Sequence, residues 1–237
     1  MKRTVDSYTK FALYDTNIPS LVKMGWEYEI DNPNLFNNKQ WIAEKEKIAA
    51  AIGTDFTFTI DGGHYVNTKG CTLGVEVRSP VGPHFMAKHW ARKLLPFTEV
   101  CEHHNGPLNN GGIHVNISKN EFTLKHWDKV QAFLHNTKYF IILLKLSDRA
   151  KNSFRHNAPQ GNYFYKCGII TSSKQYAYEL RMFGAHTDTF LPSLDFADAL
   201  FRYAATVDEI KPDEFFTWVD SRPKYNDLSK YIHHKLS

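Results

Sequence analysis

The chain has few cysteines and no cysteine motif. Its 237 residues include three cysteines, an odd number without a C-x-x-C pair. Neither a disulfide framework nor a zinc ribbon is therefore indicated, because both need cysteines in pairs or at short fixed spacings. This sparse usage favours a reducing compartment.

Long hydrophobic runs are also missing. The most apolar stretch, Tyr139 to Leu144, is flanked by Lys138 and Lys145 and is far too short to span a bilayer. The basic opening of the chain is not followed by an uninterrupted apolar region, which argues against a secretory signal peptide. We therefore expect a soluble, cytoplasmic protein without a membrane partner.

A basic tail or block is missing as well. The formal net charge is +4 and the pI is near 8.8, but the basic residues are scattered and form no recognisable nucleic-acid-binding motif. Such a mild positive surplus is equally compatible with an anionic small molecule bound through metal ions. The length suits one sizeable core, so we expect a single domain over residues 1–237.

Helical periodicity is present in five segments. We expect helices over residues 38–53, from about His84 to Cys101, over 124–148, after Ser193, and at the end of the sequence. Thr123 is the expected N-cap of the long third helix, and Ser193 that of the fourth. Pro96 is expected to kink the second helix or to mark a boundary in it.

The sequence also contains strict alternation of acids with apolar residues. In the stretch GWEYEID, the two kinds alternate as Glu27, Glu29 and Asp31 against Trp26, Tyr28 and Ile30. Successive side chains of a strand point to opposite faces, so a strand here has one acidic and one apolar face. Taken alone, this pattern also fits a half-exposed strand with a solvated outer face. We expect Asp31 to cap the turn that follows.

Four further segments repeat this two-sided pattern, namely residues 55–61, 73–80, 111–118 and 176–183. The expected helices are apolar enough to cover the shared apolar face. The sequence therefore predicts an α+β fold with a largely antiparallel sheet, which carries helices on one face and polar side chains on the other.

The polar face of this predicted sheet is rich in acids at strand centres. Its members are Glu27, Glu29, Asp61, Glu76, Arg78, His114, Asn116, Ser118, Glu179 and Arg181. Clustered carboxylates repel one another unless cations neutralise them. Oxygen ligands with one imidazole suit Mg²⁺ or Mn²⁺ better than tetrahedral zinc. Arg181 shares a face with Glu179 and would meet the charge of a metal-bound phosphate, which predicts a Mg-nucleotide site.

Five stretches in this order resemble the motif series of the amidoligase family. They are GWEYEID, DGG, GVEVRSP, GGIHVNIS and YELRMF, within residues 25–185. This family is a branch of the carboxylate–amine ligases, which include glutamine synthetase and glutamate–cysteine ligase. The resemblance implies a glutamine synthetase-like sheet whose polar face binds Mg²⁺ and ATP. It also implies that ATP phosphorylates a carboxylate and that an amine then displaces the phosphate to form an amide or peptide bond.

The resemblance further implies roles for individual residues. The expected metal ligands are Glu27, Glu29, Glu76, His114 and Glu179, the first three around one cation and the last two around a second. These glutamates and Arg181 form the expected catalytic set, in which Arg181 steadies the transferring phosphoryl group. Arg149 is expected to make a second phosphate contact, and Arg78, Asn116 and Ser118 complete the nucleotide-binding set together with His114. One of the glutamates would deprotonate the acceptor amine.

Two other functions remain compatible with the same residues. The first is a small-molecule kinase of guanidino type, which transfers the phosphoryl group and stops there. The second is an inactive relative that serves as a binding or structural protein, for instance in a virus. The loop over residues 152–165 fits either a lid over ATP or a plain surface connection.

Overall fold

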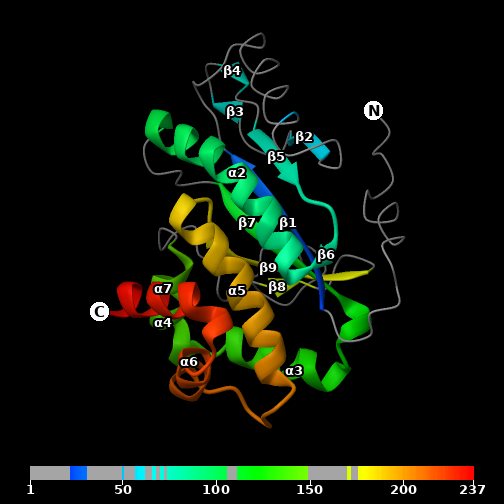
Figure 1. The fold of residues 1–237 in the computed structure, drawn as a ribbon, viewed down its shortest axis with the longest axis vertical. Helices are drawn as coiled ribbons and strands as arrows, with labels where there is room; N and C mark the ends of the chain where they lie inside the picture. The colour runs from blue at the N-terminus through cyan, green and yellow to red at the C-terminus, as the bar shows by residue number, and fades with distance from the viewer. Residues whose placement is uncertain are drawn as a thin grey trace.

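The structure is a computed structural model. It describes residues 22–30, 50, 57–61, 66–67, 70–71, 74–105, 111–148, 170–171 and 176–237. These residues form a mixed α+β fold, in which a sheet is covered by helices on one face (Figure 1). The predicted α+β class is confirmed.

The main sheet is antiparallel throughout the part of the chain that the structure describes. Its strands are β1 (Lys23–Ile30), β2 (Thr57–Asp61), β5 (Gly74–Arg78), β6 (Gly82–Pro83), β7 (Gly112–Ser118), β8 (Ile170–Thr171) and β9 (Ala177–Gly184). The order across the sheet is β2-β5-β1-β7-β9-β8, and β6 pairs with the start of β1. A separate small hairpin joins β3 (Val66–Asn67) to β4 (Gly70–Cys71). All five predicted strands are present in this arrangement, with ends that differ by at most two residues.

The helices that the structure describes with both ends lie between the middle and the end of the chain. They are α2 (His84–Asn105), α3 (Leu124–Leu134), α4 (Phe140–Ser147), α5 (Thr187–Ala204), α6 (Pro212–Asp220) and α7 (Asn226–Leu236). Short 3₁₀ turns cover Lys119–Glu121, Thr137–Tyr139 and Pro223–Tyr225. Helices α2 and α5 lie side by side across the sheet (Figure 1). None of the helices among the described residues is long and apolar enough to cross a membrane.

The predicted single helix over 124–148 is wrong, because the structure divides it into α3 and α4. The break follows from Asn136, whose side chain accepts a hydrogen bond from the backbone N–H of Lys138 at 3.0 Å. Asparagine favours such local turns over a helix interior. The predicted cap is confirmed, because the Thr123 hydroxyl accepts from the backbone N–H of His126 at 3.4 Å.

The predicted start of the next helix at Ser193 is also wrong. Helix α5 begins at Thr187, and Ser193 lies inside it with its hydroxyl donating to the Phe190 carbonyl at 2.7 Å. Burial along most of α5 outweighs the helix-breaking tendency of Pro192. Pro96 likewise lies within α2 and does not end it.

The remaining helix predictions can now be compared with the structure. The predicted C-terminal helix is confirmed by α7, whereas α6 was not predicted. The predicted helix over 38–53 lies outside the described residues, apart from residue 50, and so does the predicted turn at Asp31.

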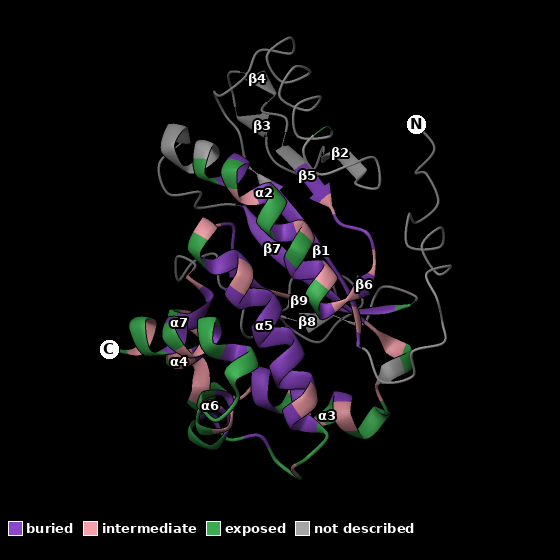
Figure 2. Ribbon diagram, viewed as in Figure 1, coloured by how far each residue is buried: buried purple, intermediate pink, exposed green. Residues whose placement is uncertain are grey.

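The core lies between the apolar face of the sheet and the helices. Trp26 and Tyr28 of β1 contact Phe190 of α5, with ring centroids 4.9 Å and 5.0 Å apart. On β9, the Phe183 ring meets Phe196 of α5 at 5.5 Å. Helix α5 is buried over most of its length (Figure 2). This packing leaves the acids that alternate with Trp26 and Tyr28 on the side away from α2 and α5.

Candidate metal centre

Three neighbouring strands bring two glutamates and a histidine together on the polar face. Glu27 of β1 pairs with His114 of β7, and Asn116 of β7 pairs with Glu179 of β9. Nδ1 of His114 lies 3.5 Å from Oε2 of Glu27 and 3.6 Å from Oε1 of Glu179. One ligand atom from each of Glu27, His114 and Glu179 lies within 4.8 Å of the other two. We call these three residues the Glu-His-Glu triad.

Polar neighbours hold the triad from two directions. Nε2 of His114 lies 3.4 Å from a carboxylate oxygen of Glu29. The side-chain amide of Asn116 donates to Oε1 of Glu27 at 3.3 Å. All three triad members are at most 4% exposed, so their carboxylates and imidazole are largely shielded from water.

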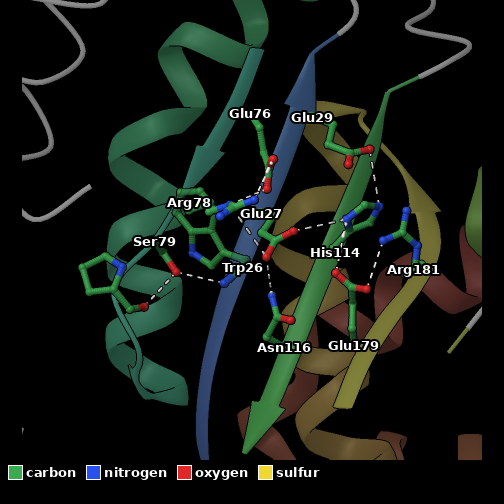
Figure 3. Close-up of polar contacts among 11 residues, drawn as sticks. Trp26, Glu27, Glu29, Glu76, Arg78, Ser79, His114, Asn116, Glu179 and Arg181 are labelled. Carbon is green, nitrogen blue, oxygen red and sulfur yellow. Dashed lines mark hydrogen bonds and ion pairs between the residues drawn. The ribbon is translucent and has the colours of Figure 1, made fainter. Parts of the chain in front are cut away.

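Two arginines flank the triad (Figure 3). Arg78 donates two hydrogen bonds to Glu76, at 2.6 Å and 3.1 Å, and its Nε lies 4.0 Å from Glu27. On the other side, Arg181 donates to Glu179 at 3.0 Å. Four carboxylates, including Glu29, thus face two guanidinium groups. Among the described residues of this group, the carboxylates outnumber the guanidinium groups when all are ionised, and such an acidic excess favours a bound cation.

A β-bulge places the histidine. Ile113 pairs with Phe183, whereas Val115 pairs with Leu180, so two residues of β9 lie opposite His114. Bulges of this kind re-aim side chains and occur often beside functional sites. The bulge also shifts the alternation of side chains along β9. Strict alternation would place Phe183 on the same face as Glu179, but its ring contacts Phe196 of α5 on the opposite face.

A glycine allows the strands next to the centre to approach closely. A Cβ atom on Gly111 would lie 2.4 Å from the backbone oxygen of Glu29 and 3.0 Å from the Cβ of Ala185. The first distance is far inside van der Waals contact, so only glycine fits there without moving β1. This close approach explains why the strand predicted over residues 111–118 begins with glycine.

Burial and neighbouring charges change the acidity of two groups. Burial raises the pKa of Glu76 from its ordinary value near 4.5 to about 7, helped by the charge of Glu27 and opposed by Arg78. For Arg181, burial alone lowers the pKa, but the carboxylates of Glu179, Glu29 and Glu27 outweigh it, so the pKa is raised. Glu76 therefore changes its charge near neutral pH, while Arg181 stays cationic.

The triad fits a divalent cation on the chemistry of its donor atoms. Nδ1 of His114 is buried and makes no hydrogen bond among the described residues. With the imidazole proton on Nε2, facing Glu29, the Nδ1 lone pair points toward the oxygens of Glu27 and Glu179. A lone pair facing two carboxylates is unfavourable, and a divalent cation between the three groups would remove this repulsion. A carboxylate on the far nitrogen is also the usual support of a metal-binding histidine.

Eight of the predicted site residues form one connected group in the structure (Figure 3). They are Glu27, Glu29, Glu76, Arg78, His114, Asn116, Glu179 and Arg181. The structure groups the ligands differently from the two predicted sets, because Glu27 joins His114 and Glu179, while Glu76 is held by Arg78.

The other predicted site residues are placed apart from this group or are not described. Ser118 ends β7 two residues beyond Asn116, half-buried and outside the triad. Asp61 ends β2, where it pairs with Gly74 of β5. Arg149 and the candidate lid over 152–165 lie outside the described residues.

A second buried charge cluster, on α5, was not predicted. Asp195 and Asp198 are 0% exposed and bind cationic side chains from other elements. The only sequence signal for it is a pair of aspartates within an otherwise apolar helical pattern.

Two comparisons with known proteins give no match. No protein-family model matches the chain, and a search of the curated proteins finds no relative.

Proposed function

We propose that the protein is an ATP- and Mg²⁺-dependent ligase that joins a carboxylate to an amine. The observation that carries the proposal is the buried Glu-His-Glu triad with an arginine on each side. The resemblance of the motif order to the amidoligase family supports the reaction class, and the triad would offer a site where a cation and an anionic phosphate chain could meet. Mn²⁺ would suit the same donors.

Glu27, His114 and Glu179 would hold the cation, and Glu29 would orient the imidazole. The bound cation would neutralise charge on the ATP phosphates. Arg78 and Arg181 are 28% and 23% exposed at their side chains, so both side chains are partly open to solvent beside the triad. They are therefore placed to contact the oxygens of a transferring phosphoryl group.

Glu76 is the carboxylate best suited to accept a proton from the amine. An ammonium must lose a proton before it attacks an acyl phosphate, and a base works best when its pKa is near the working pH. The pKa of Glu76 is about 7. The adjacent Arg78 stabilises the ionised form that acts as the base.

The direct test is incubation with ATP, Mg²⁺ and pools of carboxylates and amines, with ADP and amide products followed by mass spectrometry. We expect ADP release that depends on both substrate pools. Glu179→Gln should abolish it, while Glu99→Gln, which changes an exposed residue of α2, should not. A phosphorylated acceptor without amide would identify a kinase instead. A folded protein that neither binds ATP nor releases ADP would contradict both enzymatic functions.

A further inference from the structure

The charge cluster on α5 contains an aspartate that binds two residues of α2. Oδ1 of Asp195 lies 2.7 Å from Nε2 of His84, and its Oδ2 accepts a hydrogen bond from Lys88 at 2.7 Å. His84 and Lys88 are one turn apart at the start of α2 and are each 7% exposed. Lys88 also lies 3.7 Å from Asp227 at the start of α7. Asp195 therefore holds the first turn of α2 against α5.

The first turns of α2 are in turn bound to β1. The indole N–H of Trp26 donates to the backbone oxygen of Ala87 at 3.0 Å. Ala87 lies between the two residues that bind Asp195, so the same turn of helix contacts α5 and β1. Trp26 is fully buried and directly precedes Glu27.

The segment that leads into α2 provides a second connection. The hydroxyl of Ser79 accepts from the backbone N–H of Trp26 at 2.9 Å, and the Ser79 N–H donates to the Trp26 carbonyl at 2.9 Å (Figure 3). Residues 79–83 run from there to His84, and β6 pairs with the start of β1. Both ends of this segment are therefore fixed, one at Trp26 and the other at Asp195. Arg78, which contacts Glu27, immediately precedes it.

We propose that Asp195 is a positioning residue for the metal centre. By holding His84 and Lys88 it fixes the start of α2, and α2 fixes Trp26 and the segment after Arg78. Glu27 and Arg78 are thereby kept at their distances from His114 and Glu179. The inference rests on the proposed metal centre and adds to it a carboxylate on the opposite side of the sheet.

The chain offers a matched control in Asp198. It lies on the same helix, is equally buried, and accepts hydrogen bonds from Arg202, Lys224 and Tyr225. These partners belong to α5 and to the turn before α7. Loss of Asp198 therefore removes a comparable buried charge and leaves the contacts of Asp195 with His84 and Lys88 in place.

The test is the affinity for Mn²⁺, measured by calorimetry on the full chain. Asp195→Asn keeps the size of the side chain but turns one acceptor oxygen into a donor that faces Lys88 or His84. We expect its affinity to fall roughly tenfold, at the lower end of what loss of a supporting residue causes. Asp198→Asn should bind as the wild type does. Circular dichroism and cooperative unfolding establish that both variants are folded.

Equal affinity in Asp195→Asn and the wild type would overturn the positioning role, as would an equal loss in both aspartate variants. If Asp195→Asn does not fold, the Mn²⁺ affinity of Trp26→Phe tests the positioning role instead. This variant removes the indole N–H that donates to the Ala87 backbone oxygen and keeps an aromatic ring. Full Mn²⁺ affinity in that variant would overturn the role, and weakened affinity would support it. Glu179→Gln separates the two claims, because unchanged binding there would overturn the metal centre itself.

Discussion

Glu76→Gln should change how the stability of the protein depends on pH. In the folded protein the pKa of Glu76 is about 7, and in an unfolded chain it returns to its ordinary value near 4.5. Between these values the unfolded state loses the proton and the folded state keeps it. The folded state is therefore destabilised as pH rises, and the loss is complete once pH has passed the folded pKa.

The magnitude follows from the difference between the two pKa values. At 1.36 kcal/mol for each pH unit, a change from 4.5 to about 7 corresponds to about 3 kcal/mol. Glu76 is 4% exposed, so solvent screening reduces this value little. Glutamine cannot ionise, and the variant should gain about 3 kcal/mol relative to the wild type between about pH 4.5 and a pH above 7. Glutamine also offers Arg78 one acceptor fewer. This loss shifts the free energy of unfolding by the same amount at every pH, so the pH dependence of the difference is unchanged.

The assay is urea unfolding of both proteins in a chelator at a series of pH values, followed by tryptophan fluorescence. Glu99→Gln is the control, because that side chain is exposed. We expect the curve of Glu76→Gln to diverge from the wild type as pH rises, and the control curve to run parallel to it. Parallel curves for Glu76→Gln and the wild type would refute the reasoning.

Three further predictions concern residues near the centre or at helix ends. Gly111→Ala should lower the free energy of unfolding by about 1–3 kcal/mol, since its Cβ would lie 2.4 Å from the Glu29 oxygen; Gly25→Ala, with its closest contact at 3.3 Å, should cost less. Thr123→Ala should cost about 1 kcal/mol by loss of the α3 cap, measured by urea unfolding, and Thr123→Ser should restore most of it. Saturating Mn²⁺ should raise the melting temperature of the wild type but not of Glu179→Gln; an equal rise in both would place the ion elsewhere.

The sequence predicted which residues share a face far better than which strands are neighbours. Alternation is a local property, so the separation of Glu27 from Trp26 and Tyr28 could be read directly from the sequence. The pairing of β1 with β7, and of β7 with β9, joins residues far apart in the chain. The sequence analysis assigned these strands to one sheet but predicted neither their order nor their pairing.

The features that could not be predicted depend on contacts between distant segments. The bulge opposite His114 arises from a mismatch between β7 and β9, which neither strand encodes alone. The start of α5 was misplaced because burial overrides the signal of Pro192 and Ser193. The aspartate pair in the apolar pattern of α5 does not reveal the role of Asp195, because that role depends on His84 and Lys88 from another helix.

The central claim is that Glu27, His114 and Glu179 bind one divalent cation. Anomalous diffraction from a crystal soaked in Mn²⁺ tests this most directly, because the ion itself produces the signal. We predict a peak within coordination distance of Nδ1 of His114 and of carboxylate oxygens of Glu27 and Glu179, absent from Glu179→Gln. A crystal without a peak at the triad, or with the same peak in Glu179→Gln, would contradict the claim.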